Sequence, residues 1–169
     1  MKPEALERIR AVKRASQILR AGAWRAADAI DQVVLDADGR YRRRIVLTAE
    51  HGTTFLVDLP ETTALHDGDG LLHDDGTIVA VVAKPESLVE IAAANAADVI
   101  ATMARLAWHL GNRHTELQIV GDKLRMRPDY VLEEMLVGLG ASVTPTEAPF
   151  EPERGAYGPG QGEGRGGRG

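Results

Sequence analysis

The chain has 169 residues, 44% of them hydrophobic and 27% charged, which is enough to form one large core or two small ones. The net charge of −5 argues against nucleic acid as the main partner, and the absence of cysteine excludes disulfides, thiolate catalysis and thiolate metal sites. No apolar stretch approaches the roughly 20 residues of a membrane span, and the first 20 residues lack the apolar core of a signal peptide. We therefore expect a cytoplasmic protein without a membrane partner. Imidazole and oxygen ligands would have to form any transition-metal site.

Residues 1–24 are expected to form a helical extension. Five apolar side chains within residues 3–20 lie near one helical face, with basic residues between them: Leu6, Ile9, Val12, Ile18 and Leu19. The pattern is interpreted as a surface helix or a loosely attached extension, because a short helix on its own is marginally stable.

A small β domain is predicted over residues 25–84. Short apolar runs alternate with tight turns at Asp38-Gly39, at His51-Gly52 and within the Asp-Gly repeats of residues 67–76. Several short strands at short spacing are typical of a sandwich-like or barrel-like fold. His51, His66 and His73 lie at turns of this domain, where polar residues belong, and we do not expect them to bind metal.

A second domain is predicted over residues 85–152, after the boundary at Pro85. The pattern indicates six elements, which are a strand at 87–93, a helix at 95–111, strands at 116–120 and 123–127, a helix at 129–140 and a strand at 142–150. Asn95 and Asp129 should cap the starts of the two helices, and Gly111 and Gly140 should end them. The order β-α-β-β-α-β is the ferredoxin-like arrangement, so the predicted fold class is α+β. Residues 153–169 are rich in glycine and are expected to form a disordered tail.

No catalytic constellation is recognisable in the sequence. It contains no phosphate-binding loop and no H-E-x-x-H pair, and the Asp-Gly repeats lack the spacing of a calcium-binding loop. Glu133 and Glu134 are adjacent, so on a helix they point about 100° apart and cannot act as a carboxylate pair. A non-enzymatic protein is therefore expected.

The stretch "HLGNRH" places His114 three residues beyond the expected end of a helix, with His109 inside that helix. His114 is either an ordinary loop residue or a metal ligand held at the end of a rigid element. One histidine cannot form a specific site, because a transition ion takes several nitrogen or oxygen ligands. If two chains met about a two-fold axis, His114 would face its own copy and one ligand would become two. Such an exposed, exchangeable site suits a carrier. His109 is more readily a helix-surface or interface residue, but it stays a second candidate ligand.

The stretches "HLGNRH", "LQI" and "LRMRPDYVLEEMLVGLGASVTPTEAPFEPERGAYG" together closely resemble the C-terminal half of the UreE family of urease accessory proteins. "RRRIVL" and "LHDGDGLL" resemble the N-terminal β domain of the same family. The resemblance covers roughly residues 25–157. These motifs occur together and in the order of the family, which makes the resemblance specific.

The resemblance implies a β domain that binds a protein partner or peptide and a ferredoxin-like domain that binds metal and dimerises. It implies a homodimer in which the two copies of His114 together bind one Ni(II). Imidazole would also suit Zn(II) or Cu(II). It further implies delivery of nickel to the urease activation complex, which contains a GTPase accessory protein and the urease apoprotein. Residues 127–130 lack the further histidines that some members have there. The tail lacks the histidines of many members, so a single ion for each dimer is expected.

Two other functions stay open. The chain could be an interaction module that dimerises and binds a partner peptide without any metal function. A small metal-dependent hydrolase is the third alternative, and the lack of a recognisable general base beside His114 argues against it.

Overall fold

The computed structural model describes residues 12–155, and the chain divides into two compact units between Lys84 and Pro85. We call residues up to 84 the N-terminal unit and those from 85 the C-terminal unit. Of the expected tail, residues 156–169 lie outside the described residues, as does the start of the helix expected over residues 3–20. Within residues 12–155, neither α-helix is long and apolar enough to cross a membrane.

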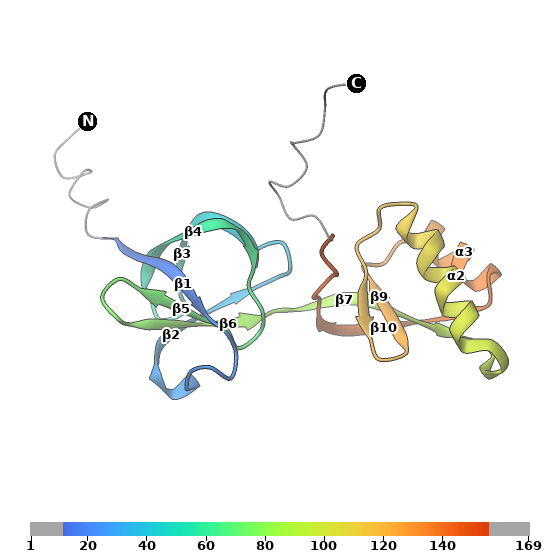
Figure 1. The fold of residues 1–169 in the computed structure, drawn as a ribbon, viewed down its shortest axis with the longest axis horizontal. Coiled ribbons are helices and arrows are strands. Elements are labelled where there is room, and N and C mark those ends of the chain that lie inside the picture. The colour runs from blue at the N-terminus through green and yellow to red at the C-terminus, as the bar shows by residue number, and fades with distance from the viewer. Residues whose placement is uncertain (1–11, 156–169) are drawn as a thin grey trace, which may run out of the picture. The chain divides into compact units, whose positions relative to one another are not determined.

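The N-terminal unit is a single curled sheet of six strands (Figure 1). Its strands are β1 (Lys13–Leu19), β2 (Ala29–Leu35), β3 (Tyr41–Thr48), β4 (Thr54–Ala64), β5 (Gly70–His73) and β6 (Ile78–Ala83), with a 3-10 turn, η1, at Ala26–Asp28. The order across the sheet is β2-β6-β5-β1-β4-β3, and the pairs β1–β4 and β2–β6 are parallel. The prediction of a small barrel-like β domain is confirmed, although the sequence did not indicate the two parallel pairs.

The helix predicted over residues 3–20 is wrong for its second half, because Lys13–Leu19 forms strand β1 in the middle of the sheet. Ala15 is fully buried between its neighbours, and Ile18 packs against the core of the unit. The helical pattern rested on few apolar residues, and pairing with β4 and β5 outweighed it. The domain start expected at residue 25 is therefore also wrong.

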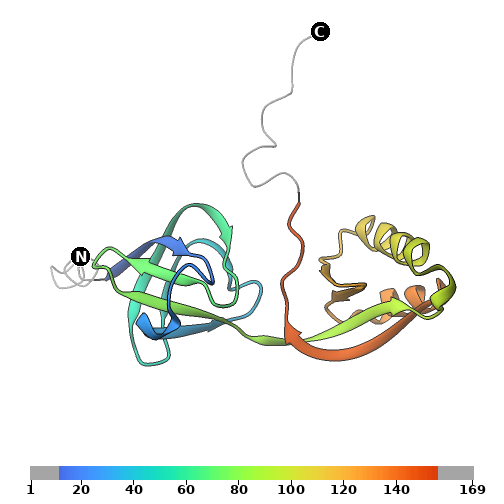
Figure 2. The same cartoon turned by 60° about the horizontal axis from the view of Figure 1, so that its bottom comes forward.

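The C-terminal unit has the predicted ferredoxin-like arrangement. Its elements are β7 (Pro85–Ala93), the 3-10 turn η2 (Ala96–Asp98), α2 (Val99–Gly111), β8 (Gln118–Val120), β9 (Lys123–Met126), α3 (Tyr130–Gly138) and β10 (Ala141–Pro149). The sheet order is β10-β7-β9-β8 and every pair is antiparallel. Both helices lie on the same face of this sheet (Figure 2). Buried side chains of the helices and strands meet there, including Ile91, Leu106, Leu110, Met126 and Leu136.

The helix ends follow the predicted capping residues in part. The Asp129 side chain accepts a hydrogen bond from the Leu132 amide at 3.0 Å, and Gly140 follows α3 with a φ of 94°, as predicted. Asn95 instead caps the short turn η2, and Asp98 caps α2 through the Ala101 amide. The turn η2 separates the two caps, so α2 begins later than predicted.

His73 is buried in the N-terminal unit, contrary to its expected position at a polar turn, and is 2% exposed. Its ring lies 4.7 Å from that of Phe55, and Nδ1 is 3.0 Å from Thr77 Oγ1. Thr77 donates its own hydroxyl hydrogen to Asp75 at 2.5 Å, so His73 Nδ1 must carry the proton and donate it to Thr77. His73 Nε2 is then a buried lone pair without a hydrogen-bond partner among the described residues.

This burial predicts an acid-sensitive N-terminal unit. Burial lowers the pKa of His73, so the unfolded chain takes up a proton near pH 6.5 that the folded chain refuses. The free energy of unfolding should therefore fall as the pH drops from 7 to 5.5, by at most about 1.4 kcal/mol per pH unit for one proton. Urea unfolding of the metal-free chain, followed by Trp24 fluorescence in a Trp108→Phe background, measures this change.

The matched control for this prediction is His73→Gln, which cannot titrate but can still donate to Thr77. Its unfolding free energy should lose that part of the slope between pH 7 and 5.5. Asp31 and Asp75, whose pKa values are lowered, destabilise the fold only at more acidic pH. An unchanged slope in the variant would mean that another group takes up the proton.

Candidate functional site

The end of helix α2 forms a Schellman motif with His114 at its central position. The His114 amide donates to the Gly111 carbonyl at 3.0 Å, and the Thr115 amide donates to the Leu110 carbonyl at 3.3 Å. These two bonds define the motif and make His114 the C′ residue, a position that usually holds glycine. Gly111, which was predicted at that position, lies inside the helix instead.

His114 adopts the left-handed backbone conformation that this position requires. Its φ is 54°, and it is the one non-glycine residue between positions 12 and 155 with a positive φ. A side chain costs roughly 1 kcal/mol in this conformation relative to glycine, although histidine tolerates it better than most residues. The imidazole is exposed to solvent, so burial of the side chain does not offset this cost. A residue kept there against backbone preference points to a use for its side chain.

The backbone that carries His114 is rigid on the helix side. Leu106 and Leu110 of α2 are fully buried. The Arg113 side chain donates to the His109 carbonyl at 3.3 Å. On the other side, Thr115 and Glu116 lead to β8. The position of the His114 backbone is therefore set by the helix end.

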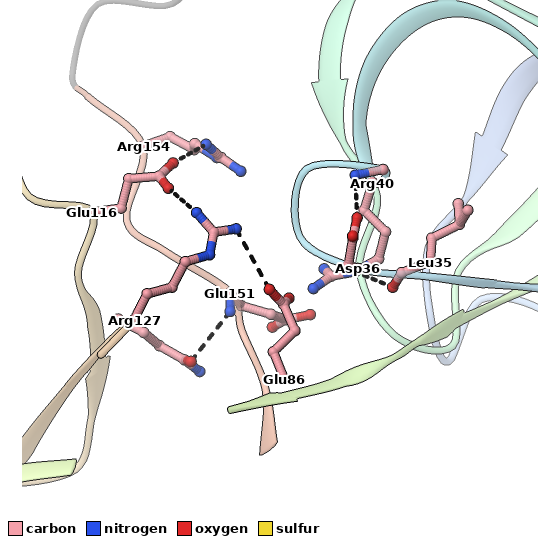
Figure 3. Close-up of polar contacts among 10 residues, drawn as sticks. Leu35, Asp36, Arg40, Glu86, Glu116, Arg127, Glu151 and Arg154 are labelled. Carbon is pink, nitrogen blue, oxygen red and sulfur yellow. Dashed lines mark hydrogen bonds and ion pairs between the residues drawn. The ribbon is translucent and has the colours of Figure 1, made fainter. Parts of the chain in front are cut away.

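His114 lines a shallow pocket of about 350 Å³ together with residues at the start of α3. The pocket also contains Glu116 and Asp129, whose carboxylates are already engaged. Glu116 accepts from Arg127 at 2.7 Å and from Arg154 at 3.3 Å, while Asp129 caps α3. Figure 3 shows Arg127 also directed to Glu86, at 3.5 Å. Both carboxylates would have to give up these bonds to bind a cation.

A single chain does not assemble a metal site in the part of the chain that the structure describes. No three histidine or carboxylate side chains of residues 12–155 lie close enough together to hold an ion. His109 lies in the last turn of α2, half-buried, with its ring edge-on to Trp108 at 5.0 Å. It does not join His114 in a cluster of ligands. Each chain therefore presents one exposed imidazole at the end of α2, that of His114.

The helices of the C-terminal unit also expose large apolar side chains. Trp108 is 64% exposed in the last turn of α2. Four others are more than half exposed on α2 and α3: Ile100, Tyr130, Val131 and Val137. Exposed apolar side chains in this number are typical of a surface that another protein covers.

The N-terminal unit has a second candidate site, a groove of about 550 Å³ beside β2 and β6. Trp24 forms one wall, where its indole nitrogen donates to the Gly68 carbonyl at 3.1 Å. Gly70 lies directly beneath the ring, because a Cβ there would come within 2.9 Å of it. Ile30 also lines the groove. The sequence did not indicate this groove, because Trp24 was expected within a helical extension.

Two buried carboxylates hold the rims of this groove. Asp69 accepts from Arg20 at 2.7 Å and from the Ala21 amide at 3.0 Å, which fixes the loop that carries Trp24. Asp31 accepts from the amide and the ring of His51, at 3.0 and 2.9 Å. Burial opposes ionisation of Asp31, but hydrogen bonds from His51, Thr53 and Gln32 outweigh it and hold its pKa well below the ordinary range.

Comparisons with known protein families match both units. The model of the UreE urease accessory protein, N-terminal domain, matches residues 7–84. The model of the C-terminal domain of the same protein matches residues 86–168. The two models together cover nearly the whole chain.

Individual relatives agree with the family models. A urease accessory protein UreE of Bradyrhizobium sp. (strain ORS 278) is 49% identical over 144 residues, which are 85% of this chain and 66% of the relative. One of Rhodopseudomonas palustris (strain HaA2) is 50% identical over 78% of this chain and 59% of the relative. One of Rhodobacter capsulatus is 45% identical over 88% of each chain. The match thus spans about two thirds of the length of the first relative and most of the last.

The prediction of a non-enzymatic protein is confirmed, because the matched models and relatives are those of an accessory protein of an enzyme. The resemblance drawn from the "HLGNRH" stretch and its neighbours is confirmed as well, over both units. By these matches, the chain belongs to the UreE urease accessory protein family.

Proposed function

We propose that this protein is a cytoplasmic nickel carrier that delivers Ni(II) to the urease activation complex during urease maturation. The observation that carries the proposal is the exposed imidazole of His114, held in a left-handed conformation at the rigid end of α2. Family membership supports the urease context. The nickel identity is the expectation attached to the family, since imidazole would also bind Zn(II) or Cu(II).

The proposed site lies between two copies of the chain. One imidazole cannot hold a transition ion specifically, and His114 belongs to no group of three or more possible ligands within the described residues. A two-fold axis near the end of α2 would place His114 of each subunit opposite its copy. Trp108, which is exposed six residues before His114, supports an interface at this end of the helix. The expected assembly is a homodimer that binds one ion.

Such a site suits transfer of the ion rather than catalysis on it. Water would occupy the coordination positions that the two imidazoles leave open, so ligands of an acceptor can replace one imidazole at a time. Imidazole binds metal only in its neutral form, so acid should release the ion. The Trp24 groove offers the N-terminal unit a place for a partner peptide, with the GTPase accessory protein and the urease apoprotein as the expected partners.

A glycine at position 114 separates the function of the His114 side chain from its structural role. His114→Gly removes the imidazole but supplies the residue that the C′ position favours. Nickel binding should be lost while the chain becomes more stable by up to about 1 kcal/mol. Titration calorimetry with NiCl2 at pH 7.5 measures nickel binding, light scattering measures the mass, and thermal unfolding measures the stability.

His109→Gln is the matched control, because it removes the other histidine of the same helix end. It should keep one Ni(II) for each two chains. Retention of nickel by His114→Gly would move the site elsewhere. Absence of nickel binding in the unmodified protein would favour the alternative function, an interaction module without metal.

A charge at position 108 tests the proposed interface between two copies of the chain. Trp108→Asp places a charge on the exposed apolar surface at the end of α2 and should convert the dimer to monomers. Nickel affinity should then fall at least 100-fold although His114 is intact, because a monomer supplies one imidazole. Light scattering and nickel titration on the same sample test both effects.

Ile30→Asp provides the control for this surface. Ile30 is an exposed apolar residue of the N-terminal unit, so its substitution should leave mass and nickel binding unchanged. A Trp108→Asp protein that stays dimeric and binds nickel normally would place the interface on another surface.

A further inference from the structure

Strand β3 carries three consecutive arginines at an open edge of the N-terminal sheet. Arg42, Arg43 and Arg44 are all exposed, and β3 pairs only with β4 in the sheet of the described residues. The pairing register with β4 shifts between Arg42 and Arg44. An edge strand leaves a row of backbone donors and acceptors free to pair with another strand.

The side chains alternate regularly along the second half of β3. Ile45 and Leu47 pack against the core, whereas Arg44 and Val46 face solvent. Val46 is 58% exposed and lies opposite Leu56 of β4, which in turn lies beside Arg14 of β1. The outer face of these three strands therefore combines an apolar centre with flanking guanidinium groups. We call this surface, formed by Arg14, Arg42, Arg44, Val46 and Leu56, the arginine face.

The positive charge of the arginine face is only partly compensated. Three basic residues of the same unit outside this face lie 2.7–2.9 Å from a carboxylate oxygen: Lys13, Arg20 and Arg25. Asp58 of β4 lies opposite Arg44, and Arg14 already binds it at 2.9 Å, while Arg44 lies 3.9 Å away. Arg42 and Arg43 have no carboxylate within ion-pair distance among the residues the structure describes. A surplus of positive charge stands here on a chain whose net charge is −5.

We propose that the open edge of β3 binds an extended acidic segment of a partner protein, which adds to the sheet as a further strand. Backbone hydrogen bonds along β3 would supply the pairing, as in other cases of strand addition. Carboxylates of the segment would meet Arg42 and Arg44, whose planar guanidinium groups suit bidentate contacts. An apolar side chain between the carboxylates would cover Val46. The proposal adds an interaction surface and does not depend on nickel binding.

A simpler explanation is that the arginines only protect the edge from unwanted pairing, as charged residues on edge strands often do. Two observations favour a binding surface. The exposed Val46 lies within the charged segment, where protection alone would favour another polar residue. Asp58 lies within ion-pair distance of both Arg14 and Arg44. Arg42 and Arg43, by contrast, have no such carboxylate among the described residues. Binding of an acidic strand decides between the two explanations.

The test uses the full chain and a fluorescein-labelled octapeptide of alternating glutamate and valine, with binding measured by fluorescence anisotropy. The peptide should bind, and affinity should fall as NaCl rises from 50 to 300 mM, because salt screens exposed charges. Arg42→Glu combined with Arg44→Glu should weaken binding at least 10-fold, and Val46→Asp should also weaken it. Arg42→Lys combined with Arg44→Lys should bind more weakly than the unmodified chain but better than the glutamate variant.

Arg25→Glu is the matched control, because Arg25 is an exposed arginine of the same unit that lies outside β3, directly before η1. It should bind the octapeptide normally. Hydrogen exchange should show new protection of β3 amides in the complex, and thermal unfolding should show that each variant is folded. Nickel binding should be unchanged in the glutamate variant, which separates this proposal from the carrier function.

Three results would overturn the proposal. The unmodified chain could fail to bind the octapeptide, which would leave edge protection as the role of the arginines. Polyglutamate and heparin could bind as tightly as the octapeptide, which would indicate attraction of any polyanion. The glutamate variant could bind as well as the unmodified chain, which would place the peptide on another surface.

Discussion

The left-handed backbone of His114 is the constraint on which the candidate metal site depends. The chain must leave α2 and turn toward β8, and the Schellman motif makes that turn through a residue with positive φ. Glycine would make the turn at lower cost, and Gly111 is only three residues away. With histidine at the C′ position, the same backbone bonds that end the helix also point an imidazole into solvent. The end of the helix and the position of the ligand are therefore set by the same interactions.

In the N-terminal unit, two buried carboxylates hold the connections between strands in place. A small curled sheet has few apolar side chains to hold its long connections in place. Asp69 fixes the loop that carries Trp24, and Asp31 fixes the tip of the β3–β4 hairpin through His51 and Thr53. Hydrogen bonds from His51, Thr53 and Gln32 hold the pKa of the Asp31 carboxyl well below its ordinary range, so this carboxylate stays ionised. Since these bonds are made within the unit, the groove beside Trp24 is formed before any partner binds.

Local signals in the sequence predicted the C-terminal unit well, because its helices have a clear period and Asp129 and Gly140 mark the ends of α3. They failed for β1, whose partners lie far away in the sequence: Lys13 pairs with Phe55. The burial of His73 could have been predicted, since Leu71 lies two residues earlier and therefore on the same face of β5. The role of His114 as the C′ residue could not, because Gly111 gave the stronger local signal for the end of α2.

The two units carry opposite kinds of surface, and this difference bears on how a carrier would work. The C-terminal unit exposes apolar side chains beside a single imidazole, which favours a symmetric contact with a second copy and an ion shared across it. The N-terminal unit exposes uncompensated arginines and a preformed groove, which favours contacts with proteins of different sequence. A carrier must hold its ion and recognise the acceptor at once. In the proposed carrier the two tasks belong to separate units, so recognition of the acceptor and release of the ion can occur as separate steps.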